Sequence, residues 1–162
     1  MTIEELTIRL KQEAESFNQN EPFASPMLQE QILLKDSFKE MLTVTLACGL
    51  AGEIINREKL ETLINSCFEK FPEILEYAKK DLVATVLRDP ACLGYLEPLL
   101  FFKGFQGLQA YRIAHALWKN NERFTAKMFQ SIISRKFGMD IHPAAQIGHG
   151  LLIDHATNIV IG

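Results

Sequence analysis

The sequence contains few residues that could cross-link the chain or hold a structural metal. It has three cysteines in 162 residues, and their spacing matches no metal-binding motif. Because Cys48, Cys67 and Cys92 are odd in number, they cannot all pair in disulfides within the chain. Reduced, buried thiols in a cytoplasmic protein are therefore expected, and no metal site is predicted.

Positive charge and long apolar runs are also scarce. The 17 lysines and arginines are outnumbered by 20 aspartates and glutamates, which argues against a basic, nucleic-acid-binding surface. The longest uncharged apolar stretch, Met41 to Gly52, is shorter than the roughly 20 residues of a transmembrane helix. The first residues, MTIEELTIRLKQEAE, are acidic and lack the apolar core of a signal peptide. We therefore predict a cytoplasmic protein that binds neither nucleic acid nor membrane.

Helical signals dominate the chain from Thr2 to about Phe137. Thr2 and Glu5 form a capping-box pattern, as do Ser37 and Glu40, and apolar residues at helical spacing follow the first pair. Other expected boundaries are a loop at Asn18 to Phe23, N-caps before proline at Ser25-Pro26 and Asp89-Pro90, helix starts at Asn56 and Pro72, and helix ends at Gly49, Gly52, Asn120-Asn121 and Gly138. Two further helices are predicted at about 101–118 and 124–136.

A different pattern begins after Gly138. Isoleucine recurs every six residues, a period that fits neither an α-helix nor a two-sided strand. The four residues are Ile141, Ile147, Ile153 and Ile159. Six is the period of hexapeptide β-helices, in which each unit forms a short strand and a turn. Three units make one coil, so residues 141–158 are predicted to form one coil and residues 159–162 to begin a second. We therefore divide the chain into a helical domain, residues 1–138, and the start of a β-helix domain, residues 139–162.

Two longer runs of sequence carry a family resemblance. KGFQGLQAYRIAHALW, from Lys103 to Trp118, and MDIHPAAQIGHGLLIDHATNIVIG, from Met139 to Gly162, resemble signature segments of bacterial serine O-acetyltransferases. The run Arg88-Asp89-Pro90-Ala91 is similar to that family as well. The resemblance implies a mainly α protein, with an N-terminal α-helical domain followed by the first coil of a left-handed parallel β-helix. It also implies a homo-oligomer, a trimer or a dimer of trimers, joined through the helical domains.

The family transfers the acetyl group of acetyl-CoA to the hydroxyl of L-serine, the first committed step of cysteine synthesis. The resemblance therefore implies L-serine and acetyl-CoA as substrates, with no permanently bound cofactor. His155 matches the general base that takes the hydroxyl proton, a task that suits an imidazole titrating near neutral pH. Asp140 matches the aspartate that pairs with this base and would fix its tautomer. Asp89 and Asp154 match the two carboxylates that hold the amino group of serine.

Each of these residues also has a structural interpretation from the sequence alone. His155 is then a solvated corner histidine, Asp140 a cap at the domain junction and Asp154 a solvent-facing residue. Asp89, which precedes a proline, fits an N-cap. The remaining polar candidates are interpreted as structural: His142 in packing or a turn, His149 on a solvated surface, His115 in the core or an interface, and Arg112 and Gln109 fixing the helix or a subunit contact.

Parts of the family pattern are not found in the 162 residues. The second active-site histidine and most acetyl-CoA contacts lie downstream in the family, so no cofactor-binding residue is assigned here. We expect this chain alone to be inactive or nearly so. We also expect no complex with O-acetylserine sulfhydrylase, which binds the family's C-terminal tail. Asn158 replaces a glycine that commonly follows the DHAT motif, and asparagine tolerates a left-handed corner.

Two other functions remain open. A helical lobe of this apolar content also suits a non-catalytic oligomerisation module. The second alternative is a hexapeptide acyltransferase that acts on a sugar or another amine. The run KGFQGLQAYR argues against it, because sugar acyltransferases usually lack such a helical lobe.

Overall fold

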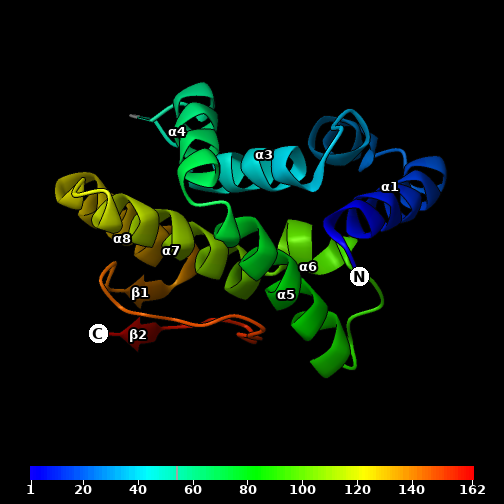
Figure 1. Cartoon of the computed structure of the whole chain (residues 1–162). Helices are drawn as coiled ribbons and strands as arrows, with labels where there is room; N and C mark the ends of the chain where they lie inside the picture. The colour runs from blue at the N-terminus through cyan, green and yellow to red at the C-terminus, as the bar shows by residue number, and fades with distance from the viewer. Residues whose placement is uncertain (54) are drawn as a thin grey trace.

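The computed structural model describes residues 1–53 and 55–162, most of which are helical. The elements follow in the order α1 (Ile3–Asn20), α2 (Ser25–Leu28), the π-helical turn η1 (Gln29–Leu33), α3 (Phe38–Leu50), α4 (Arg57–Lys70), α5 (Glu73–Arg88), α6 (Leu96–Phe101), α7 (Lys103–Lys119), α8 (Arg123–Phe137), β1 (Met139–Ile141) and β2 (Ile159–Ile161). Figure 1 shows α3 and α4 on one side of the long α7–α8 pair and the two strands on the other side. The predicted mainly α fold is confirmed.

Several helix boundaries form where the sequence predicts them. The Thr2 hydroxyl accepts the N–H of Glu5 at 3.1 Å, and the Glu5 carboxylate accepts the N–H of Thr2 at 2.7 Å. At the start of α4, the side chain of Asn56 accepts the N–H of Lys59 at 3.0 Å. Gly138 ends α8 with a φ of 70°, in the left-handed region that favours glycine. These boundaries depend on residues close together in the chain, which explains why the sequence pattern reveals them.

Three predicted boundaries differ from the structure. Helix α1 continues to Asn20, into the segment predicted as a loop, because no helix-breaking residue interrupts it there. Ser25 lies inside α2, and the residue at the N-cap position is Ala24. Asp89 ends α5 instead of beginning a new helix, and its carboxylate accepts the N–H of Ala91 in a local turn. The Asp-Pro pair fits both a helix start and a turn, and the structure forms the turn.

The start of α3 departs from expectation in one respect, and its end at Leu50 falls between the two predicted stops, Gly49 and Gly52. The Ser37 hydroxyl accepts the N–H of Glu40 at 3.3 Å, as predicted. The Glu40 carboxylate accepts the N–H of Asp36 instead of that of Ser37, so the reciprocal half of the capping box is displaced by one residue. Gly49 lies inside the helix, which ends at Leu50. A glycine near the end of a helical pattern therefore marks the boundary only to within a few residues.

Helix α7 forms the centre of the helical lobe. An unbroken run of buried residues, 104–114, shows that it is covered on every side. It packs against α3, α4, α5, α6 and α8. Phe38, Tyr111 and Phe129 are the largest of the almost fully buried side chains. Burial of such side chains is the main source of stability, at about 25 cal/mol per Å² of apolar surface. Within the described part of the chain, no helix is long and apolar enough to cross a bilayer.

The C-terminal segment, residues 139–162, returns on itself once. Strands β1 and β2 pair in parallel, and the register joins Met139 to Ile159 and Ile141 to Ile161. The prediction of one coil over residues 141–158 would pair Ile141 with Ile159. The structure pairs Ile141 with Ile161 instead, so the observed coil is two residues longer. Side chains alternate along a strand, so a shift of two residues keeps the isoleucines on the same face. The isoleucine spacing alone therefore cannot distinguish the two registers.

Candidate functional site

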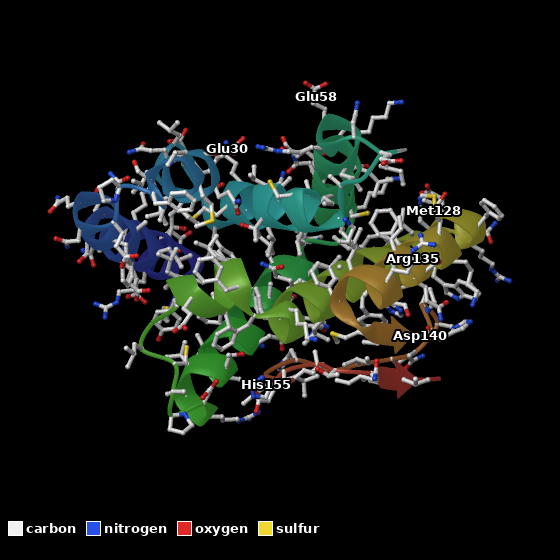
Figure 2. All side chains as sticks on the ribbon, turned by 180° about the vertical axis from the view of Figure 1, so that it is seen from behind. Glu30, Glu58, Met128, Arg135, Asp140 and His155 are labelled. Carbon is white, nitrogen blue, oxygen red and sulfur yellow. The ribbon has the colours of Figure 1, made fainter. Side chains whose placement is uncertain are left out.

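Asp154 and His155 lie at an exposed corner of the C-terminal segment, which Figure 2 marks by the label on His155. Their side chains are 64% and 90% exposed, and His155 Nε2 lies 3.7 Å from Asp154 Oδ1. An exposed imidazole can accept a proton from a bound molecule, and a carboxylate beside it can hold a cationic group. We refer to this pair as the Asp154–His155 corner.

The backbone of the corner is left-handed at several residues. His155, Ala156 and Asn158 have φ values of 51°, 50° and 58°. This conformation costs roughly 1–2 kcal/mol for most residues that carry a Cβ, so it persists only where surrounding contacts impose it. Asparagine tolerates the conformation, which agrees with the prediction made for Asn158.

The beginning of α7 supplies the surrounding contacts. A Cβ built on Gly104 would lie 1.9 Å from the carbonyl oxygen of Ile153, so only glycine permits this close approach. The same Cβ would lie 3.4 Å from the side chain of Ala156, which is fully buried. Lys103 Nζ donates to Thr157 Oγ1 at 3.2 Å. The start of the KGFQGLQAYR run thus holds the chain on both sides of the corner.

Asp89 reaches the same end of the molecule from α5. It is half-buried, and its carboxylate accepts the N–H of Ala91 at 2.9 Å. The preceding residue, Arg88, donates from Nη1 to the carbonyl oxygen of Gly150 at 2.8 Å. This bond fastens the end of α5 to the segment that leads to Asp154. The neighbour of Asp89 is therefore tied to the chain four residues before Asp154, and a joint role of Asp89 and Asp154 stays a prediction.

Asp140 is placed elsewhere. It lies in β1, where Gln130 Nε2 of α8 donates to its Oδ1 at 2.5 Å. Figure 2 labels both Asp140 and His155 and shows them at opposite ends of the C-terminal segment. The contact between Asp140 and His155 that the resemblance implies is therefore not made within a single chain.

A buried ion pair lies behind the segment that approaches the corner, and its acidic member was not among the residues singled out from the sequence. Asp81 of α5 is 0% exposed, Arg112 of α7 is 4% exposed, and Arg112 Nη2 lies 2.6 Å from Asp81 Oδ2. Gln109 Nε2 donates to the same oxygen at 3.0 Å, and the N–H of Leu151 donates to Asp81 Oδ1 at 3.0 Å. The sequence did hold a signal, because Asp81 falls on the face of α5 that also carries the buried Ala78. A charged residue on an apolar face needs a partner.

The other three histidines have structural surroundings. His115 Nδ1 donates to the carbonyl oxygen of Pro143 at 2.7 Å. His142 Nδ1 accepts the N–H of Ala144 at 3.1 Å, which confirms its place in a turn, and His149 is exposed. Among residues 1–53 and 55–162, no three His, Cys, Asp or Glu side chains are arranged to hold a metal ion.

Comparison with known proteins identifies the family. The family model "Serine acetyltransferase, N-terminal" matches residues 7–110, more than half of the chain. Over 159 residues the chain is 41% identical to serine acetyltransferase 1, chloroplastic, of Arabidopsis thaliana, covering 98% of this chain and 51% of that protein. Over 153 residues it is 40% identical to the serine acetyltransferase of Haemophilus influenzae, covering 94% of this chain and 57% of that protein. The chain thus spans about half the length of these curated relatives.

A solved structure agrees with the sequence comparisons. A serine acetyltransferase in complex with CoA matches this chain with a TM-score of 0.97 and 38% identity, covering 99% of this chain and 68% of the other. The match includes both the helical lobe and the C-terminal segment. The resemblance inferred from the KGFQGLQAYR and DHAT motifs is therefore confirmed, and the chain belongs to the serine acetyltransferase family.

Proposed function

We propose that this chain forms part of an enzyme that transfers the acetyl group of acetyl-CoA to the hydroxyl of L-serine. The observation that carries the proposal is the exposed Asp154–His155 corner, which α7 supports in a chain of the serine acetyltransferase family. A proton acceptor beside a carboxylate suits a substrate that has both a hydroxyl and an ammonium group. The complex of a related enzyme with CoA supports acetyl-CoA as the co-substrate.

In the proposed reaction, His155 takes the proton of the serine hydroxyl as its oxygen attacks the acetyl carbonyl carbon. The bond between that carbon and the sulfur of CoA breaks, and the thiolate takes up the proton that His155 accepted, so that CoA leaves as the thiol and the imidazole becomes neutral again. Asp154 and Asp89 hold the ammonium group of serine by opposite charge. Because the two carboxylates come from different elements, together they would fix the orientation of the substrate.

The proposed role of Asp140 requires a second copy of the chain. Within one chain Asp140 is bonded to Gln130 and lies at the far end of the segment from His155 (Figure 2). We therefore assign its contact with His155 to an interface between copies, in keeping with a trimer or a dimer of trimers. In this proposal residues 1–138 form the oligomerisation domain, and residues 139–162 begin the catalytic β-helix domain.

The binding of acetyl-CoA is assigned to the part of the relatives that this chain does not match. The chain covers 51% of one curated relative and 57% of another, which leaves room for such a site. The 162-residue chain by itself is accordingly expected to show little or no transfer.

The state of the cysteines supports a cytoplasmic location. Cys67 and Cys92 are buried and Cys48 is partly buried, and all three are free thiols. Free thiols persist in a reducing compartment, whereas oxidising compartments favour disulfides.

The proposal is tested by joining residues 1–162 to the remaining C-terminal part of the Haemophilus influenzae relative. We expect this chimera to release CoA from acetyl-CoA when L-serine is added, measured with a thiol reagent. The His155→Ala variant should lower the rate by about 10²–10⁴-fold, the usual contribution of a general base. The matched control is His142→Ala, which removes a histidine held in a turn and should retain most of the activity.

Two results would contradict the proposal. A folded chimera that releases no CoA in response to L-serine, while the relative is active, would refute the assigned reaction. An equal loss of activity in the His142→Ala and His155→Ala variants would refute the assignment of His155 as the base.

A further inference from the structure

Residues 143–151 connect β1 to the Asp154–His155 corner, and helix side chains hold their backbone. The bonds run from His115 Nδ1 to Pro143 O, from Tyr111 Oη to Ala145 O, from Arg112 Nη1 to Ile147 O, from Arg112 Nη2 to Gly148 O and from Arg88 Nη1 to Gly150 O. In a β-helix, the backbone of one coil pairs with the neighbouring coil. Along this stretch, side chains of α5 and α7 make hydrogen bonds to the backbone that a neighbouring coil would otherwise make.

Asp81 is the centre of this set of contacts. Its Oδ2 accepts from Arg112 Nη2 at 2.6 Å, from Arg112 Nε at 3.1 Å and from Gln109 Nε2 at 3.0 Å. Its Oδ1 accepts the N–H of Leu151 at 3.0 Å, only three residues before Asp154. Arg112, oriented by Asp81, donates to the carbonyl oxygen of Gly148 at 2.8 Å. One buried carboxylate thus holds the segment directly and also through its arginine.

Two features indicate that the cluster sets the path of the chain. Its contacts with the segment are all to main-chain atoms, so they specify where the backbone runs whatever side chains it carries. Gln109 Oε1 is buried and has no hydrogen-bond partner in the described part of the molecule, while its Nε2 donates to Asp81. An unpaired buried oxygen is costly, and so is a buried ion pair that apolar residues could replace. The cluster therefore keeps a buried polar network whose hydrogen bonds to the main chain fix the path of the segment.

We propose that Asp81 is a positioning residue, which acts through Arg112 and the N–H of Leu151 to aim the chain into the Asp154–His155 corner. In this proposal the contacts from the helical lobe determine the backbone path of the first coil. The claim about the path of the chain stands on the contacts alone. Only its consequence for serine rests on the proposed function.

The test is hydrogen exchange measured by mass spectrometry on the whole chain, comparing the Asp81→Asn variant with the unaltered protein. We expect exchange of the Leu151 N–H to become about tenfold faster or more, since its acceptor loses its charge, and the other bonded amides of residues 145–157, those of Ala145 and Ala156, to follow as the segment loosens. Peptides from α3 should keep their protection. The methyl resonance of Ala156, which is fully buried at the corner, should move toward its value in an unfolded chain.

Two milder variants keep the test decisive if Asp81→Asn unfolds the protein. Tyr111→Phe removes only the hydroxyl that donates to Ala145 O, and Arg88→Met removes an exposed guanidinium that donates to Gly150 O. Both should loosen residues 145–157 selectively, by a smaller factor than Asp81→Asn. The matched controls are Tyr95→Phe in the helical lobe and Arg135→Met on α8, which Figure 2 shows away from the corner. Neither control should change exchange in the segment.

The proposal is overturned if the folded Asp81→Asn variant keeps the protection of the segment and the Ala156 resonance in place, or, where that variant unfolds, if neither milder variant loosens the segment. It is also overturned if the milder variants loosen α3 as much as the segment, because their effect would then be general. Exchange requires no substrate, so this outcome is independent of whether the chimera acetylates serine. In the chimera, Arg88→Met should raise the KM for L-serine more than it lowers kcat if the serine role holds.

Discussion

The helical lobe and the C-terminal segment are held together in different ways. The lobe satisfies its backbone within helices and buries a continuous apolar core, in which residues such as Leu42 and Phe38 are 0% exposed. The C-terminal segment has one pair of three-residue strands, and much of its remaining backbone is bonded to side chains of α5 and α7. Its surface is also more open, with Val160 of β2 78% exposed.

This difference implies that the fold of the segment depends on the lobe, whereas the fold of the lobe does not depend on the segment. The lobe has a core of its own, so its helices are expected to persist when the segment detaches. The segment is anchored by lobe side chains and by the close approach at Gly104, so it should lose its shape when the lobe unfolds. Substitutions that disturb one region at a time should separate the two, and the largest effect is expected in the core of the lobe.

Truncation of the lobe's core should unfold both regions together. Leu42→Ala removes a fully buried side chain of α3, and such changes typically cost about 2–5 kcal/mol. Helical circular dichroism and hydrogen exchange of residues 145–157 should lose their signals at the same denaturant concentration. The control is Leu34→Ala, whose side chain is 72% exposed and whose change should stay within about 0.5 kcal/mol. If residues 145–157 keep their protection from exchange after the lobe has unfolded, the proposed dependence of the segment on the lobe is contradicted.

Gly104→Ala should detach the segment and leave the lobe folded. The added Cβ would lie 1.9 Å from the carbonyl oxygen of Ile153, a backbone atom that cannot move aside alone. Overpacking of this kind costs about 1–3 kcal/mol, whereas alanine within a helix is more favourable than glycine by about 1 kcal/mol. We therefore expect faster exchange at residues 153–157 with unchanged helical dichroism.

Two other glycines provide controls for this substitution. Gly52→Ala should have no effect on the segment, since no heavy atom of the described residues, apart from its chain neighbours, lies within 4 Å of the new Cβ. Gly107→Ala brings its Cβ to 2.4 Å from Met139 Sδ, but that thioether is flexible and can turn away. Its effect should be smaller than that of Gly104→Ala. If Gly104→Ala leaves exchange at residues 153–157 unchanged, α7 does not support the corner.

Local signals in the sequence predicted much of the lobe. The capping pair Thr2 and Glu5, the cap at Asn56 and the stop at Gly138 each involve residues within one helical turn, so pattern and structure coincide. Asp89 was one of the exceptions, because its side chain can cap a following helix or close a turn, and the choice depends on how α5 ends.

Contacts between distant segments were beyond the reach of the sequence. Asp81 pairs with a residue 31 positions away and with the main chain of Leu151, 70 positions away. The register of β2 was mistaken by two residues because Ile159 and Ile161 are equally apolar and lie on the same face. The family motif predicts roles for Asp140 and His155, but it did not reveal that Asp140 is hydrogen-bonded to Gln130 within the chain.

Loss of a single helix cap should have a smaller, global effect. Asn56→Ala removes the side chain that accepts the N–H of Lys59 at the start of α4, a change that usually costs about 1 kcal/mol. The stability of the lobe measured by denaturant unfolding should fall by that amount, and the segment should follow it. The control is Ser66→Ala, an exposed position on the same helix, where no loss is expected. A loss confined to the segment would argue against the proposed direction of dependence.

A last expected effect is a pH dependence to which the buried Cys67 thiol of α4 contributes. Burial raises the pKa of the Cys67 thiol to about 11, above its ordinary value of 9.0, and the Glu122 carboxylate adds to the shift. Because the folded state disfavours the thiolate, this contribution to stability is fully present below pH 9 and is lost as the pH rises toward 11. At pH 8 the alkylation of Cys67 should be slow and should report opening of the lobe.

The same thiol then separates the two regions in a single experiment. Gly104→Ala should leave the alkylation rate of Cys67 unchanged, because the segment detaches without exposing α4. Leu42→Ala should increase that rate, because it destabilises the core in which Cys67 is buried. Cys67→Ala provides the reference for labelling of Cys48 and Cys92. It should also reduce the fall in stability at high pH, to which Cys48, Cys92 and Tyr111 contribute as well, because burial raises their pKa values. Equal acceleration by Gly104→Ala and Leu42→Ala would mean that the lobe depends on the segment as much as the segment depends on the lobe.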